Sequence, residues 1–153
     1  MSNNGGKNGD SSGHKNGGAR LHVASHTPWE SKVGYSRAVR AGSMVFVSGT
    51  TATNEKGEIV SPSDPAEQAR QALKNIEKAL KGAGVALKDV VQTRIYVVDI
   101  DHWEEIGRVH AEFFKDIRPA TSMIEVSSLV HPDMLVEIEA VAVAPEQSTQ
   151  AQV

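Results

Sequence analysis

An amphipathic helix that begins at Asp64 is the strongest constraint that the sequence places on the fold. Asp64 is a favoured N-cap residue, Pro65 suits the first helical position, and Glu67 is placed to complete a capping box. Gly82 and Gly84 mark the end of the helix. Apolar residues recur at spacings of three and four along one side: Ala69, Leu73, Ile76, Leu80 and Ala83. Such a stripe must be buried against another element, and its alanines favour close packing on a sheet.

Strand-like segments on both sides of this helix supply that sheet. Before the helix, residues 35–50 predict a hairpin with its turn at residues 41–43, and residues 59–60 suggest a short edge strand. After the helix come three further strands, at residues 90–98, 120–127 and 134–142.

A second helix is predicted after Asp101, between two of these later strands. Its expected buried stripe consists of Trp103, Ile106, His110, Phe113 and Phe114. The element order is therefore β-β-(β)-α-β-α-β-β. The simplest fold with this order is of the α+β class, with one mixed sheet that carries both helices on a single face.

The last strand indicates what covers the other face of the sheet. Alternation gives the helix side an apolar set: Val136, Ile138, Ala140 and Ala142. The opposite side mixes apolar residues with two carboxylates: Leu135, Glu137, Glu139 and Val141. A half-apolar face that carries charges is typical of a surface covered by another subunit. We therefore expect an oligomer.

The two ends of the chain differ in composition from its middle. Residues 1–24 are rich in Gly, Asn and Ser and predict a disordered tail. They contain no apolar run of the kind that a secretory signal requires. We expect one domain at residues 25–145 and a second disordered tail at residues 146–153.

Composition also narrows the class of function. The formal net charge is −3, and no basic stripe suited to nucleic acid is visible. The longest apolar run is too short to span a membrane. The chain has no cysteine, and its six histidines lack metal-ligand spacing, so we expect no metal site. The absence of cysteine fits a reducing environment, and we expect a cytoplasmic protein.

Five short motifs occur in the order and spacing of a known family. They are Tyr35, Ser48-Gly49-Thr50, residues 68–76, Pro119-Ala120-x-Ser122-x-x-Glu125-Val126 and residues 136–140. Together they resemble the Rid family of reactive intermediate deaminases, also called the YjgF family, over nearly the whole domain. The resemblance implies a fold similar to that of bacterial chorismate mutase. It also implies a homotrimer with clefts between neighbouring subunits.

The resemblance carries a chemistry as well. The best-known members hydrolyse enamines and imines to a 2-keto acid and ammonia, without a cofactor. Transferred by motif, the family pattern gives substrate contacts to Tyr35 and Ser48 and the water-activating carboxylate to Glu137. The implied partner is a small, anionic metabolite.

One part of the family site is missing from this sequence. Where deaminase-type members have an arginine that binds the substrate carboxylate, this chain has Thr121, and Met123 and Gly107 also depart from the pattern. Arg37 lies two residues after Tyr35 on the same strand face, so it is our candidate for a replacement cation. Arg118 is the second candidate.

Three functions are compatible with these observations. The leading one is cofactor-free hydrolysis of a small reactive imine or enamine. Loss of the arginine at Thr121 favours a second, a trimer that binds or senses a metabolite without chemistry. Ribonuclease activity, which is associated with some relatives, is disfavoured by the net charge of −3.

Overall fold

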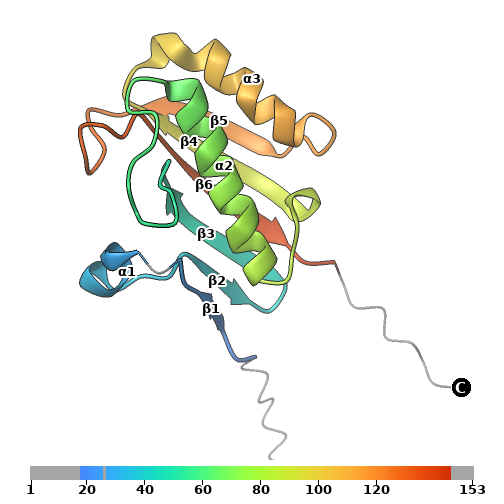
Figure 1. Ribbon diagram of the computed structural model, residues 1–153. Coiled ribbons are helices and arrows are strands. Elements are labelled where there is room, and N and C mark those ends of the chain that lie inside the picture. The colour runs from blue at the N-terminus through green and yellow to red at the C-terminus, as the bar shows by residue number, and fades with distance from the viewer. Residues whose placement is uncertain (1–17, 26, 146–153) are drawn as a thin grey trace, which may run out of the picture.

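The computed structural model describes residues 18–25 and 27–145, which form one sheet with two long helices on one face (Figure 1). The strands are β1 Leu21–Val23, β2 Ala38–Ala41, β3 Met44–Thr50, β4 Val90–Val97, β5 Ala120–Glu125 and β6 Val136–Val143. The helices are α1 Pro28–Val33, α2 Pro65–Gly82 and α3 Trp103–Phe114, with 3₁₀ turns at Leu87–Asp89 and Ile100–His102. The expected α+β class is confirmed, with both long helices on the same side of a mixed sheet.

The sheet has the order β1-β2-β3-β6-β4-β5, so the last strand lies near its centre. Only β4 and β5 run parallel to each other, and the other neighbours are antiparallel. In β6, Ala140 pairs with Val47 of β3 on one side and with Thr93 of β4 on the other. The register with β3 shifts between Val47 and Thr50. This irregularity lies beside Glu137 and helps to shape the cavity described below.

Helix α2 begins and ends where the sequence predicts. The Asp64 carboxylate accepts a hydrogen bond from the Glu67 amide at 3.0 Å, and Pro65 occupies the first turn. The chain leaves the helix at Gly84, whose φ of 78° lies in the left-handed region that favours glycine. The predicted stripe is buried: Ala69, Leu73, Ile76, Leu80 and Ala83 are all at most 1% exposed.

The predicted division of β6 into two faces is confirmed from Val136 onward, whereas Leu135, which we expected on the open face, precedes the strand and packs against the main core. The four residues of its helix side are buried and belong to the main core: Val136, Ile138, Ala140 and Ala142. The alternate positions Glu137, Glu139 and Val141 are only partly buried, on the side of the sheet away from α2 and α3.

One residue that we expected in the core, Trp103, is exposed instead, and so is Val91 of β4. Trp103 is 56% exposed, and Ile106, Val109 and Phe114 are the buried residues of α3. The 3₁₀ turn before α3 makes Trp103 its first residue, on the solvent side. Val91 is 47% exposed because the pairing of β4 with β6 shifts between Val90 and Gln92. This shift reverses the alternation that the later part of β4 predicts.

The N-terminal part of the domain contains structure that the sequence did not reveal. Residues 21–23, inside the segment assigned to the tail, form β1 and pair with β2. Residues 28–33, for which we predicted no element, form α1. The segment around Ile59 makes a single bridge to Thr53 rather than a strand. Residues 1–17 of the predicted tail, and the predicted tail at 146–153, lie outside the described residues. No described helix is long and apolar enough to cross a membrane.

Candidate functional site

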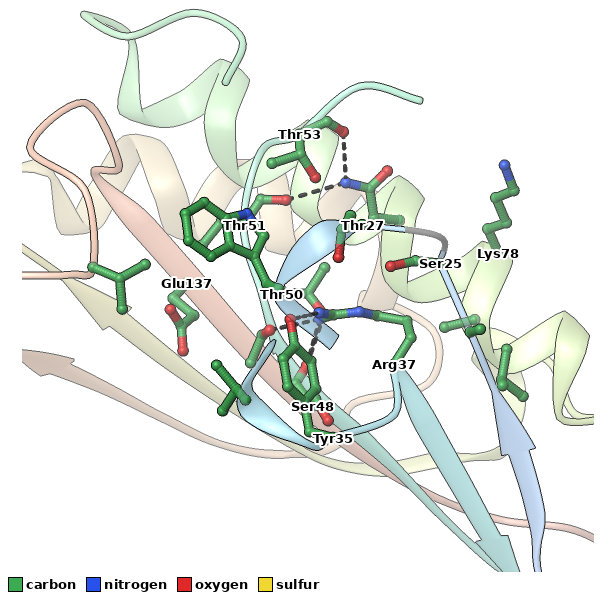
Figure 2. Close-up of a pocket in the computed structure, with 18 of the residues that line it drawn as sticks. Ser25, Thr27, Tyr35, Arg37, Ser48, Thr50, Thr51, Thr53, Lys78 and Glu137 are labelled. Carbon is green, nitrogen blue, oxygen red and sulfur yellow. Dashed lines mark hydrogen bonds between the residues drawn. The ribbon is translucent and has the colours of Figure 1, made fainter. Parts of the chain in front are cut away.

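A cavity of about 740 Å³ opens where the segment around α1, the end of β3, helix α2 and the start of β6 meet. Four of the residues predicted from the sequence line it: Tyr35, Arg37, Ser48 and Glu137 (Figure 2). The hairpin supplies the first three, and the central strand β6 supplies the carboxylate. The fold therefore brings one cation and one carboxylate from distant parts of the sequence into one cavity.

Arg37 is held in place by several hydrogen bonds along one wall. Its Nη1 donates to the Gly49 carbonyl at 2.6 Å and to Thr50 Oγ1 at 2.9 Å, while Nη2 donates to the Tyr35 hydroxyl at 3.0 Å. The Glu30 carboxylate lies 3.9 Å from Nε, and the arginine side chain is 11% exposed. Arg37 therefore acts as a strut that fixes β3 and Tyr35. Only part of its guanidinium remains for a ligand.

Ser48 is anchored beside Arg37. Its hydroxyl donates to the Ser36 carbonyl at 2.7 Å, and its amide donates to the Arg37 carbonyl at 3.0 Å. The Ser48 carbonyl in turn accepts a hydrogen bond from Thr50 Oγ1 at 2.7 Å. The serine proton is thus used within the fold, and its oxygen lone pairs are what it can offer to a ligand.

Glu137 lies directly against the backbone of Gly49. A Cβ added to Gly49 would stand 2.1 Å from Glu137 Oε1, so only glycine leaves room for the carboxylate in this position. Burial raises the pKa of Glu137, the neighbouring Glu139 carboxylate raises it further, and the Arg37 guanidinium opposes this rise. A carboxylate with a raised pKa can accept and return a proton closer to neutral pH than an exposed glutamate can.

Glu139, two residues further along β6, is occupied by structural contacts. It accepts a hydrogen bond from the Tyr96 hydroxyl at 3.3 Å, and Arg94 Nη1 lies 3.7 Å from its carboxylate. Its charge still acts on Glu137 through space. Of the two carboxylates on this side of β6, Glu137 is therefore the one that faces the cavity.

Comparison with known proteins shows to which family this sequence and fold belong. The sequence profile of the family described as Endoribonuclease L-PSP matches residues 25–144. A crystal structure of a YjgF/YER057c/UK114-family member from Mycobacterium tuberculosis superposes with a TM-score of 0.76 and 52% identity, covering 82% of this chain and all of that one. The chain belongs to the YjgF (Rid) family.

Two relatives carry names that state an activity. The 3-aminoacrylate deaminase RutC of Acinetobacter baylyi is 39% identical over 108 residues, which is 71% of this chain and 85% of the relative. The 2-iminobutanoate/2-iminopropanoate deaminase of Escherichia coli K12 is 36% identical over 113 residues, or 71% of this chain and 86% of that one. Deaminases of small enamines and imines are thus found among YjgF relatives of this chain.

The two remaining predicted site residues lie away from the cavity of this YjgF domain. Thr121, on β5, donates to the Pro119 carbonyl at 3.1 Å and shares a 2.8 Å hydrogen bond with Thr93 Oγ1. Thr93 Oγ1 is in turn 2.9 Å from Nε2 of His110, and burial lowers the pKa of that histidine. Arg118 is exposed, with a φ of 54° at the entrance to β5. Within one chain, neither residue joins Glu137.

Sequence reasoning missed several residues that line the cavity. Thr27 and Ser25 come from the segment before α1, for which we predicted no element, and Lys78 comes from α2. Asn75, part of a family motif, donates to the carbonyls of Thr51 and Thr53 and so holds the opposite wall. The position of Lys78 could have been noticed in the sequence, because it lies three residues after Asn75, a residue of a family motif, on the same helix. Within residues 18–25 and 27–145, no group of three or more metal-ligating side chains is found.

Proposed function

We propose that this YjgF-family protein hydrolyses a small reactive imine or enamine in the cavity around Glu137, without a cofactor. One observation carries the proposal: the Glu137 carboxylate is half-buried in the cavity, packs against the Gly49 backbone, and has a pKa that burial raises. Its setting suits it to act first as a base and then as an acid. The deaminase names of two relatives support the same reaction class.

The proposed reaction needs one water and one proton carrier. The imine reacts in its protonated form. Glu137 takes a proton from water as the water oxygen bonds to the imine carbon, which leaves an amine and a hydroxyl on one carbon. The carboxylic acid then gives this proton to the nitrogen. As the C–N bond breaks, Glu137 takes the proton of the hydroxyl, ammonia and a carbonyl compound leave, and this last proton returns to solvent. An enamine first gains a proton on carbon to become the protonated imine. Holding the reactants in place supplies much of the acceleration.

We further propose that the active form is a homotrimer in which a neighbour completes the cleft. The side of the sheet away from α2 and α3 carries exposed apolar residues from several strands, including Phe46 at 48% and Ile124 at 45%. Exposed apolar surface of this kind favours a subunit interface. A neighbour would also bring residues that a single chain places elsewhere, such as Thr121, within reach of another cavity.

A specific observation favours a second candidate, a trimer that binds a metabolite without reacting with it. Thr121 stands where the deaminase pattern has arginine, and Arg37 is largely committed to Gly49, Thr50 and Tyr35. A site without a free guanidinium to bind the carboxylate has a lower affinity for a 2-imino acid. Such a protein would be stabilised by small carboxylates and would release no ammonia.

The two candidates separate in a single assay. An imine generated in situ is mixed with the protein, and the release of ammonia and keto acid is timed. The hydrolase is expected to accelerate release over buffer, and Glu137→Gln to reduce kcat by roughly 10²–10⁴-fold, the usual loss of a general acid–base group. Glu77→Gln removes the same charge from the exposed side of α2 and should change nothing.

The folding of the Glu137→Gln variant can be anticipated from the pKa shift. A carboxyl whose pKa is raised on folding stabilises the protein at low pH and loses that contribution as pH rises through the folded pKa. A neutral amide at this site should therefore not lower Tm near pH 7. Equal rates for the wild type and Glu137→Gln, in a folded variant, would remove Glu137 from the mechanism.

A further inference from the structure

The cavity has a second polar end that the chemistry at Glu137 does not use. Lys78 of α2 lines this end, and Figure 2 shows Lys78 and Glu137 on opposite sides of Arg37. Much of the remaining wall is apolar, formed by Val23, Trp29, Val33, Ala79, Val130 and Met134. A cavity that has Glu137 on one side of Arg37 and Lys78, with its partner Glu55, on the other suits a ligand whose anionic tail replaces Glu55.

Lys78 is available to such a ligand. Among the described residues its ionic partner is Glu55, at 3.2 Å, and the two side chains are 76% and 90% exposed. An exposed pair of this kind contributes little to stability, so a ligand anion can replace Glu55. The Arg37 side chain, in contrast, is 11% exposed, and its Nη1 donates hydrogen bonds to the Gly49 carbonyl and to Thr50 Oγ1. Of these two cations, Lys78 is the one free to move toward a ligand.

Thr27 supplies a second, independent observation. Within residues 18–25 and 27–145, its Oγ1 is the one buried side-chain N or O atom without a hydrogen-bond partner. Thr27 lines the cavity and occupies the N-cap position of α1, yet its side chain makes no capping hydrogen bond. A buried hydroxyl without a partner is costly, and rotation of the Thr27 side chain toward the cavity would let a ligand oxygen satisfy it.

The size of the cavity agrees with an extended ligand. Its volume of about 740 Å³ falls within the range of pockets that hold drug-sized molecules, which is more space than a short imino acid fills. We propose that Lys78 and Thr27 hold the anionic end of the substrate, while its C=N group lies at Glu137. The substrate class is then an imine or enamine that bears a carboxylate on a linear apolar chain. The catalytic half of this inference rests on the proposed function, and the binding half does not.

The binding half is tested by calorimetry with linear monocarboxylates, from propionate to octanoate. Hexanoate is expected to bind the wild type more tightly than propionate, and Lys78→Gln should weaken hexanoate roughly tenfold, the loss of one charge-assisted contact. Thr27→Val should weaken it less, because the lost partner is uncharged. Glu55→Gln should tighten binding, since it removes the competing carboxylate. Lys74→Gln is the matched control, because Lys74 is exposed on the same helix and does not line the cavity.

The outcomes separate this inference from the proposed function. Absence of hexanoate binding to the wild type, or an equal loss in Lys78→Gln and Lys74→Gln, would overturn the anionic subsite. Hydrolysis of an imine that carries a carboxylate on a linear apolar chain, with the same KM in wild type and Lys78→Gln, would overturn the subsite as well, while leaving Glu137 as the catalytic group. Lys78-dependent binding of hexanoate without any hydrolysis would leave the subsite in place and remove the enzymatic function.

Discussion

At the scale of single residues, Gly49 controls the position of the Glu137 carboxylate. In Gly49→Ala the new Cβ would overlap Glu137 Oε1, and the flexible end of the glutamate would have to move aside. The φ of Gly49 is not in the left-handed region, so alanine fits the backbone. We expect kcat for imine hydrolysis to fall about 10²-fold, as a displacement of about 1 Å can cause, while Tm changes little.

Gly107 offers the matched control for this substitution. It lies in α3, and an added Cβ there would meet nothing within 4 Å. Gly107→Ala should therefore raise stability by about 0.5–1 kcal/mol through helix propensity and leave the rate unchanged. Thermal unfolding and initial rates of both variants provide the comparison. A Gly49→Ala variant with wild-type kcat would show that the position of the carboxylate does not matter.

The pH dependence of the rate is a second property set by single residues. Burial and the Glu139 charge raise the pKa of Glu137, and the reaction requires the ionised base. The rate should therefore increase as pH rises through this pKa. Glu139→Gln removes one of the two causes, so the pKa falls and the acidic limb of the pH–rate profile moves to lower pH. Glu77→Gln should leave the limb in place, and an unmoved limb in Glu139→Gln would contradict the assignment of the base.

At the scale of elements, the sequence predicts those helix ends and strand faces that residues close in sequence determine. Helix α2 could be bounded because Asp64, Pro65 and Gly84 act within a few residues of their own position. The two faces of β6 could be separated because alternation is regular along the whole strand. Trp103 was wrongly expected in the core, because the 3₁₀ turn before α3 decides which side the first helical residue faces.

The residues of the site could likewise be predicted where a short motif marks them, and could not where their contacts depend on the pairing of distant strands. Tyr35, Ser48 and Glu137 could be placed from their motifs, and the structure brings them to one cavity. The strut contacts of Arg37 could not be foreseen, because they depend on the irregular pairing of β3 with β6 beyond Val47. Helix α1 has only six residues, too few for a clear period, so the contribution of its segment to the cavity was also missed.

At the scale of the whole molecule, the proposed trimer depends on the sheet face opposite α2 and α3. Phe46 lies on this face, is 48% exposed and pairs with Val141 of the central strand. Burial of a phenylalanine contributes about 1.5–3 kcal/mol per copy, so Phe46→Asp should dissociate the assembly into folded monomers. Trp103→Asp is the control, because this residue is as exposed on α3 but lies on the helical side of the sheet.

Assembly and activity should be lost together if the cleft is built by two subunits. Sedimentation across a dilution series gives the mass, far-ultraviolet circular dichroism reports whether the monomer stays folded, and the imine assay gives the rate. The expected result for Phe46→Asp is a folded monomer with little activity, although no residue that lines the cavity has changed. A wild type that sediments as a single chain would refute the trimer, and a fully active Phe46→Asp monomer would show that one chain completes the site by itself.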